Sequence, residues 1–202
     1  MTVLYFFPEE LRTPWYMWEQ RWNEIQEIRL RVNCPVSIRT ISGERFLLNK
    51  EGERVSYSDR EMELIFRHLC HDSIYAYEEE RKQGYMTLTG GHRVGITGEV
   101  IRVEQGYIVK YIRYMNIRIA HEVVGIGESI REYMYDGGMP CNSLIISPPA
   151  AGKTTLLRDM VRMYADGNGQ YRGINVGVID ERGEIAGACR GSASLHLSLI
   201  HI

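Results

Sequence analysis

The stretch SPPAAGKTT, residues 147–155, decides the fold of this chain. The apolar run NSLII at 142–146 precedes it and is typical of a buried strand, and LLRDMV at 156–161 follows it with the spacing of a helix. A strand, a tight loop ending in Gly-Lys-Thr and a helix turn backbone N–H groups toward one point, where phosphate oxygens bind. The stretch therefore predicts a cradle for nucleotide phosphates.

The residue types in this loop suit that chemistry. Gly152 lets the backbone approach a phosphate without a Cβ, Lys153 offers an ammonium to the outer phosphates, and the Thr154 hydroxyl can ligate Mg²⁺. The predicted cofactor-binding residues, for ATP with Mg²⁺ on Thr154, are Ser147, Ala151, Gly152, Lys153, Thr154, Thr155 and Asp180.

Two positions depart from the strict loop pattern. Ser147 stands where the pattern begins with glycine, and Ala150 occupies a middle position that is often glycine in such loops. An alanine forced to a positive φ would be strained, which would weaken nucleotide binding without changing the fold. The alternative interpretation is a proline-containing loop whose lysine is there by chance.

A second acidic segment follows the predicted helix. The run GINVGVIDER at 173–182 indicates an apolar strand that ends in Asp180 and Glu181, the carboxylates an NTPase needs. Because it is the next strand in chain order, we do not assign it as Walker B. We predict Glu181 as the water-activating base, Asp180 as a supporting carboxylate, and Lys153 as the other catalytic residue; a solvated strand end is the alternative.

Composition sets broad bounds on the chain. It has 202 residues, of which 44% are hydrophobic and 25% charged, and this composition is ordinary for a globular protein. The formal net charge of −2 gives no basic excess, so we do not expect nucleic acid as a partner. No apolar stretch approaches the roughly 20 residues of a membrane span. The four cysteines at 34, 70, 141 and 189 form no C-x-x-C pair, so we expect neither a zinc site nor a disulfide framework, and a cytoplasmic setting.

The residues before the loop predict a separate α+β domain. Trp15, Trp18, Trp22, Ile25 and Ile28 have helical spacing over 15–28, alternating strands follow at 27–32 and 36–40, and further strands form hairpins over 84–109. Ser58 and Glu61 form a capping box for a second helix, and 75–81 is also predicted helical. We expect an N-terminal α+β domain at 1–115, a linker with a helix around Ile130 at 116–140, and an incomplete P-loop domain at 141–202.

Five segments together resemble one protein family. They are EIRLRVNCPVSI at 27–38, TGGHRVGITGE at 89–99, NIRIAHEV at 116–123, SLIISPPAAGKTTLLRD at 143–159 and VGVIDERGEIAGACRG at 176–191. The chain resembles the stage III sporulation protein AA family of endospore-forming bacteria over roughly residues 10–191. That family is similar to the ATPases of type II and type IV secretion systems, so the implied fold class is α/β, an α+β domain followed by a truncated RecA-like P-loop NTPase domain.

The resemblance carries functional expectations. It implies an ATP hydrolase that forms hexameric rings on the cytoplasmic, mother-cell side of a membrane and serves a secretion-like channel complex with other stage III sporulation proteins. Arg118 becomes a candidate to face the nucleotide, with a strand-surface charge as the alternative. A doubly wound sheet needs later strands, so we expect this chain to stop inside that domain and residues 192–202 to depart from the family. A nucleotide-binding regulatory or assembly module without turnover stays open as a second function.

Overall fold

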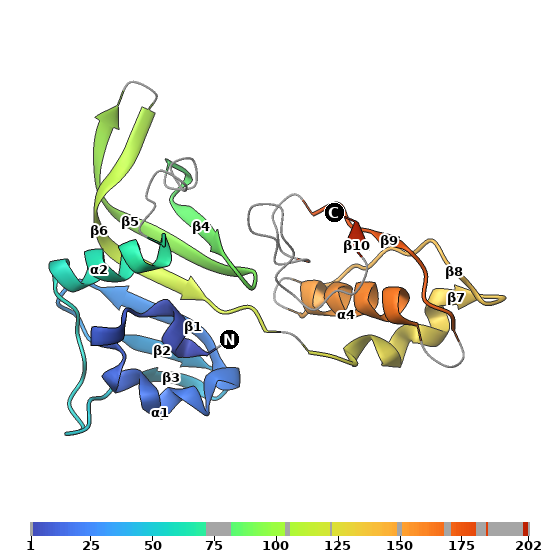
Figure 1. Cartoon of the computed structure of the whole chain (residues 1–202), viewed down its shortest axis with the longest axis horizontal. Helices are drawn as coiled ribbons and strands as arrows, with labels where there is room; N and C mark the ends of the chain where they lie inside the picture. The colour runs from blue at the N-terminus through green and yellow to red at the C-terminus, as the bar shows by residue number, and fades with distance from the viewer. Residues whose placement is uncertain are drawn as a thin grey trace. The chain divides into compact units, whose positions relative to one another are not determined.

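The computed structural model describes residues 2–71, 82–103, 106–121, 123–148, 151–167, 171–180, 185 and 200–201. The chain divides into two compact units, one of residues 1–88 and 92–120 and one of residues 89–91 and 121–202 (Figure 1). None of the helices in the described ranges has the length and apolar character of a membrane span. The predicted helix at 75–81 lies outside the described residues.

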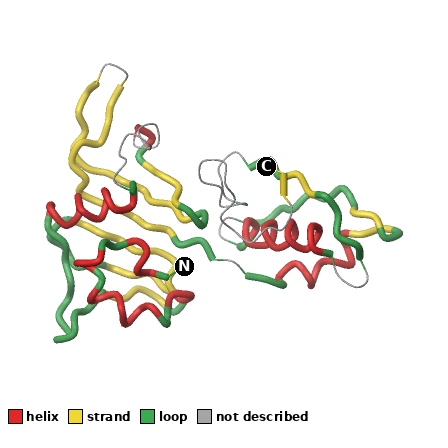
Figure 2. The backbone as a smooth tube through the Cα atoms, in the orientation of Figure 1, coloured by secondary structure: helices red, strands yellow, loops and turns green. Residues whose placement is uncertain are grey.

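The first unit is built on a six-stranded sheet in the order β3-β2-β1-β6-β5-β4, in which every neighbouring pair is antiparallel. Its long strands stand out in Figure 2. The strands are β1 (Ile25–Arg31), β2 (Ser37–Thr40), β3 (Gly43–Phe46), β4 (Tyr85–Leu88), β5 (His92–Val103) and β6 (Gly106–Arg118). The antiparallel pairing confirms the predicted N-terminal α+β domain, and β6 continues to Arg118, so the start of the predicted linker belongs to this sheet.

Helical segments bury one face of this sheet. They are η1 (Val3–Phe6), η2 (Glu9–Leu11), η3 (Thr13–Trp15), α1 (Tyr16–Glu19), η4 (Trp22–Glu24) and α2 (Asp59–Leu69). Their apolar side chains form one core with the inward residues of the strands, among them Phe6, Trp15, Ile28, Phe66 and Ile117. The capping box is confirmed, because the Ser58 N–H donates to Glu61 Oε2 at 2.8 Å and the Glu61 N–H donates to Ser58 Oγ at 3.4 Å.

The predicted helix over 15–28 is wrong beyond its first turns. Its residues form short 3-10 and α turns and then enter β1 at Ile25. The strand register shifts between Ile25 and Glu27, so Ile25 and Ile28 are both buried although they are three residues apart. A β-bulge thus produces a spacing that resembles the helical period, and pairing with strands on both sides fixes the segment as a strand.

The second unit contains η6 (Ile126–Met134), β7 (Tyr135–Asp136), β8 (Met139–Pro140), α4 (Lys153–Asp166), β9 (Val176–Gly177) and β10 (Ile200–His201). The predicted helices around Ile130 and after residue 152 are confirmed, the former as a 3-10 helix. β9 pairs in parallel with β10, so two residues of the segment that we expected to depart from the family pair with a strand of the second unit.

The predicted buried strand at 142–146 is wrong in this structure. Residues 141–148 have no regular secondary structure, and Leu144 and Ile146 are 84% and 82% exposed. A strand is stabilised only when a neighbouring strand takes its backbone hydrogen bonds and a packed layer covers its side chains. Within the described ranges, this segment pairs with no strand, and of its apolar side chains Ile145 packs against the cluster of Met134, Met160 and Met163 while Leu144 and Ile146 stay exposed.

Candidate nucleotide-phosphate site

The loop enters α4 through a glycine in the left-handed conformation. Gly152 is the N-cap of α4, with φ 87° and ψ 12°, and it offers no side-chain cap to the first N–H groups of the helix. A Cβ built on Gly152 would have nothing within 4 Å, so the space beside these amides is open. A helix N-terminus without a side-chain cap, beside open space, is suited to a phosphate group, because its N–H groups and the positive end of the helix dipole face that space.

Lys153 folds back over the loop that precedes it. Its ammonium Nζ donates to the carbonyl oxygen of Ser147 at 3.4 Å, and its side chain is exposed. The Ala151 N–H donates to the carbonyl oxygen of Pro148 at 3.4 Å, which closes a turn between them. The structure therefore brings Ser147, Ala151, Gly152 and Lys153 together, while Pro149 and Ala150 lie outside the described residues.

Thr154 and Thr155 lie in the first turn of α4 and are half-buried. The helix is held in place by a small apolar cluster. Its buried members are Met134, Met160 and Met163, and Ile130, Tyr135, Ile145, Leu156 and Tyr164 pack against them. Because residues of η6, of the 141–148 segment and of α4 share this cluster, the predicted phosphate-binding turn is anchored to the body of the second unit.

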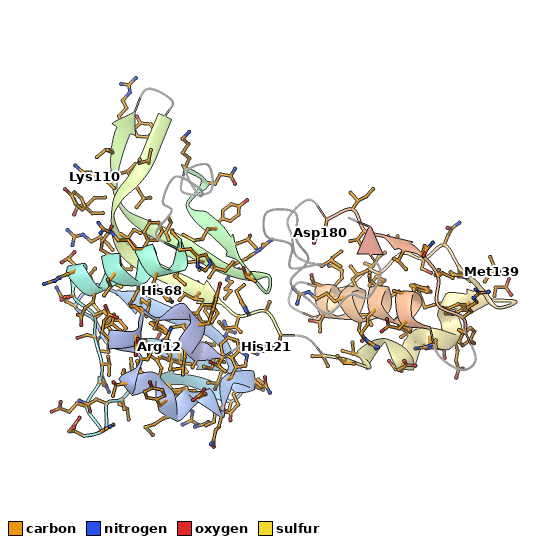
Figure 3. The ribbon with its side chains drawn as sticks, viewed as in Figure 1. Arg12, His68, Lys110, His121, Met139 and Asp180 are labelled. Atoms are coloured by element: carbon orange, nitrogen blue, oxygen red, sulfur yellow. The ribbon has the colours of Figure 1, made fainter. Side chains whose placement is uncertain are left out.

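Asp180, labelled in Figure 3, follows β9 by three residues and is half-buried. Its carboxylate oxygen Oδ2 accepts the backbone N–H of Ile185 at 2.6 Å. Val178 before it is buried, which is the pattern expected of a strand end that carries a carboxylate. The predicted base, Glu181, lies outside the described residues.

Arg118 is exposed at the end of β6 in the first unit, paired in register with Glu27 on β1 and with Arg93 on β5. Burial would raise the pKa of Glu27, but hydrogen bonds from Arg29 and Asn116 and the positive charges of Arg29 and Arg118 hold that pKa below its usual value. The environment of Arg118 within its own unit is thus that of a charge on the sheet surface.

Sequence reasoning missed a buried carboxylate in the middle of α4. Asp159 accepts the backbone N–H groups of Gly125 at 2.9 Å and of Gly127 at 2.7 Å, and Arg162 Nε donates to it at 2.8 Å. Burial would raise the pKa of Asp159, but these hydrogen bonds lower it below its ordinary value. One signal was present in the sequence: Asp159 falls three residues after Leu156, on the apolar face of the helix, where an unpaired carboxylate would be costly.

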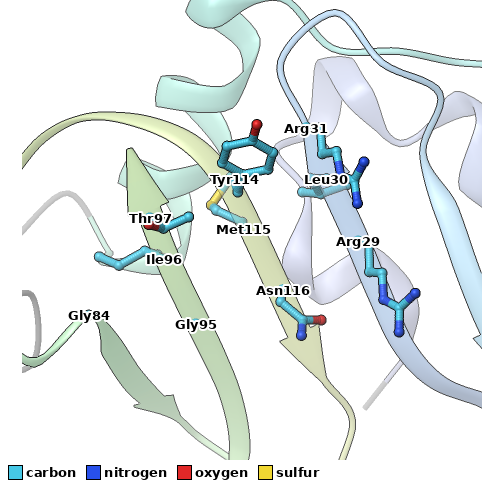
Figure 4. Close-up of a pocket in the computed structure, with 10 residues that line it drawn as sticks. All are labelled: Arg29, Leu30, Arg31, Gly84, Gly95, Ile96, Thr97, Tyr114, Met115 and Asn116. Carbon is cyan, nitrogen blue, oxygen red and sulfur yellow. The ribbon is translucent and has the colours of Figure 1, made fainter. Parts of the chain in front are cut away.

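The open face of the first unit has a hollow of about 360 Å³ (Figure 4). Its lining includes Arg29, Arg31, Tyr114 and Asn116, with the Arg31 guanidinium carbon 5.8 Å from the centre of the Tyr114 ring. None of the predicted site residues contributes to it. Across the described ranges, no group of three or more His, Cys, Asp or Glu side chains is placed to hold a metal ion.

Comparison with known proteins connects this geometry to a family. The family model for sporulation stage III, protein AA, matches residues 8–199, beyond Gly191, where we expected the family pattern to end. Stage III sporulation protein AA of Bacillus subtilis (strain 168) is 42% identical over 175 residues, which cover 86% of this chain and 54% of that protein. The chain therefore spans about half the length of this curated relative.

Two solved structures share a weaker likeness. They are the Legionella pneumophila ATPase DotB (13% identity, TM-score 0.43, covering 81% of this chain and 45% of that one) and the VirB11 ATPase of the Brucella suis type IV secretion system in complex with sulphate (12% identity, TM-score 0.36, covering 79% and 50%). At these scores the likeness supports no assignment, whereas the family model covers most of the chain. The chain belongs to the sporulation stage III protein AA family.

Proposed function

We propose that this chain binds ATP with Mg²⁺ at residues 147–155 and is part of an ATPase subunit that serves a secretion-like channel complex between mother cell and forespore. The observation that carries the ATP-binding proposal is the left-handed Gly152 at the uncapped N-terminus of α4, directly followed by Lys153. Membership of the sporulation family supports the cellular setting.

Each residue has a role that its side-chain or backbone chemistry suits. The amides at the start of α4 and the Lys153 ammonium would bind phosphate oxygens, and the hydroxyl of Thr154 would ligate the metal. Mg²⁺ supplies, when bound, neutralisation of charge on the phosphate oxygens. Asp180 would orient water near that site, and Glu181 would act as the base that accepts a proton from the attacking water.

The wider setting follows from the family and is also part of the proposal. We infer a homo-oligomeric ring, with a hexamer as the expected form, that works at the cytoplasmic face of a mother-cell membrane. Its partners would be the other stage III sporulation channel proteins, with no nucleic acid required. A formal net charge of −2 is consistent with a protein partner rather than a nucleic acid.

Nucleotide binding is tested by calorimetric titration of the chain with ATP in the presence of Mg²⁺. Lys153→Ala should weaken binding at least about tenfold, because a charge-assisted contact to phosphate contributes roughly 1.5–3 kcal/mol. Lys50→Ala is the matched control, since Lys50 is an exposed lysine of the first unit. Equal affinity of wild type and Lys153→Ala would refute the proposed site.

A nucleotide-binding assembly module without turnover is the second candidate. The hydrogen bond from the Ile185 N–H to Asp180 favours it, because it engages a carboxylate that turnover would otherwise use. Measuring phosphate release at saturating ATP separates the two functions. Turnover that is lost in Glu181→Gln supports the ATPase, and tight binding with no turnover in a chain of the relative's full length supports the module.

A further inference from the structure

Asp159 ties the middle of α4 to the segment that begins the second unit. Asp159 is 4% exposed, and its two carboxylate oxygens accept different backbone N–H groups, Oδ1 that of Gly125 and Oδ2 that of Gly127. Arg162, one turn further along α4, donates to Oδ1 from Nε at 2.8 Å. A buried carboxylate with three hydrogen bonds and a paired cation is a fixed link rather than a surface charge.

The two glycines are adapted to this link. Gly125 has φ 91°, a conformation that residues with a Cβ rarely adopt. A Cβ on Gly127 would stand 3.1 Å from Asp159 Oδ2, closer than ordinary contacts allow. The Gly125-Ile126-Gly127 segment therefore presents two backbone N–H groups to one carboxylate.

A neighbouring contact strengthens the link. Arg158 Nη1 donates to the carbonyl oxygen of His121 at 3.3 Å. We call residues 123–127 the junction segment. Two consecutive residues of α4 thus contact this part of the chain: Arg158 bonds to His121 just before the junction segment, and Asp159 bonds to Gly125 and Gly127 within it. By chain connectivity this segment follows β6 (Gly106–Arg118) of the first unit, so α4 touches the chain where it arrives in the second unit.

We propose that Asp159 is a positioning residue that couples nucleotide binding at the start of α4 to the junction segment. The proposal rests on the function proposed above, since it needs a nucleotide at Gly152 and Lys153. A helix transmits a shift of its first turn along its length, because its backbone hydrogen bonds keep the turns together. A nucleotide that orders or moves α4 therefore acts on Gly125 and Gly127 through the Asp159 carboxylate.

Amide hydrogen exchange of the peptide spanning 123–128 measures this coupling directly. If opening of the junction segment also disrupts the nucleotide site, a bound nucleotide analogue slows exchange in this peptide. At a concentration [L] of a non-hydrolysable ATP analogue equal to ten times its Kd, the slowing is up to about tenfold, as given by the factor 1 + [L]/Kd. We expect that slowing in the wild-type chain.

Two variants break the link from opposite sides. Asp159→Asn replaces one acceptor oxygen by an amide on α4. Gly127→Ala introduces the close Cβ from the junction segment and leaves the sequence of α4 unchanged. Both should keep nucleotide affinity within about threefold of wild type, a change of roughly 0.6 kcal/mol, while the analogue no longer slows exchange in the peptide. Gly177→Ala is the control, because a Cβ there meets nothing within 4 Å, and it should behave like wild type.

The outcomes are distinguishable. Absence of analogue binding in the wild-type chain overturns the proposed function and this coupling with it. Normal binding without slower exchange at 123–128 overturns the coupling alone. If the role of Asp159 were purely structural, Asp159→Asn would raise exchange by the same factor in both states, so the analogue would still slow exchange at 123–128, and this result would contradict the proposal. A loss of affinity in Asp159→Asn but not in Gly127→Ala would contradict it as well. Circular dichroism of each variant establishes that it is folded before exchange is measured.

Discussion

Substitution of Gly152 by alanine separates backbone strain from blockage of the phosphate site. Gly152 has φ 87°, and nothing lies within 4 Å of the position that a Cβ would take, so the alanine costs only the left-handed backbone, about 1–2 kcal/mol. For a domain of 60–100 residues, 1 kcal/mol lowers Tm by roughly 4–8 °C. The added methyl group also enters the open space where the phosphate is proposed to bind, so affinity for ATP should fall at least about tenfold, or 1.4 kcal/mol.

Gly138 provides the matched control for this experiment. It has φ 83° in the turn between β7 and β8, and a Cβ there also meets nothing within 4 Å. Gly138→Ala should therefore lose a similar 1–2 kcal/mol of stability by urea denaturation while its ATP affinity, measured by titration calorimetry, stays at the wild-type value. If Gly152→Ala binds ATP within twofold of wild type, or if Gly138→Ala loses as much affinity, the assignment of the loop is wrong.

Three further predictions concern stability. Ser58→Ala removes the N-cap of α2 and should cost about 0.5–2 kcal/mol in urea denaturation with unchanged ATP affinity; an equal stability would mean that the capping box contributes nothing. Burial raises the pKa of Tyr57 from its ordinary value to about 12, although a hydrogen bond from Trp15 acts to lower it. Stability should therefore fall by roughly 2–3 kcal/mol between pH 10 and pH 12, because the unfolded chain loses this proton first; Tyr57→Phe should flatten that slope. The pKa of Asp159 is lowered, so its contribution is complete above the unfolded pKa of about 3.9 and is lost as pH falls through the folded value. Acid titrations of wild type and Asp159→Asn should therefore converge below pH 4, and parallel curves would contradict this.

The parts of the fold that the sequence predicts well are those that depend on local sequence patterns. The capping box at Ser58 and the helix after Gly152 depend on contacts within a few residues, so sequence spacing alone identifies them. The predicted strand at 142–146 failed for the opposite reason: a strand needs partners elsewhere in the chain, and Leu144 and Ile146 are exposed without them. Burial of an apolar run is decided by what packs against it, which the run itself does not encode.

The sequence by itself predicted a phosphate-binding loop with its lysine and threonines, and it determined the α+β character of the first unit and the family of the chain. Only the tertiary structure decided that Ile25 belongs to a bulged strand, because a bulge and a helix both bring residues three apart to one face. It also decided the partners of Asp159, since a carboxylate 32 residues away from Gly127 can be matched to that N–H only when the chain has folded. A hydrogen bond between a buried side chain and backbone N–H groups far away in the chain produces no periodic pattern in the sequence. The link between α4 and the junction segment could therefore be identified only from the tertiary structure.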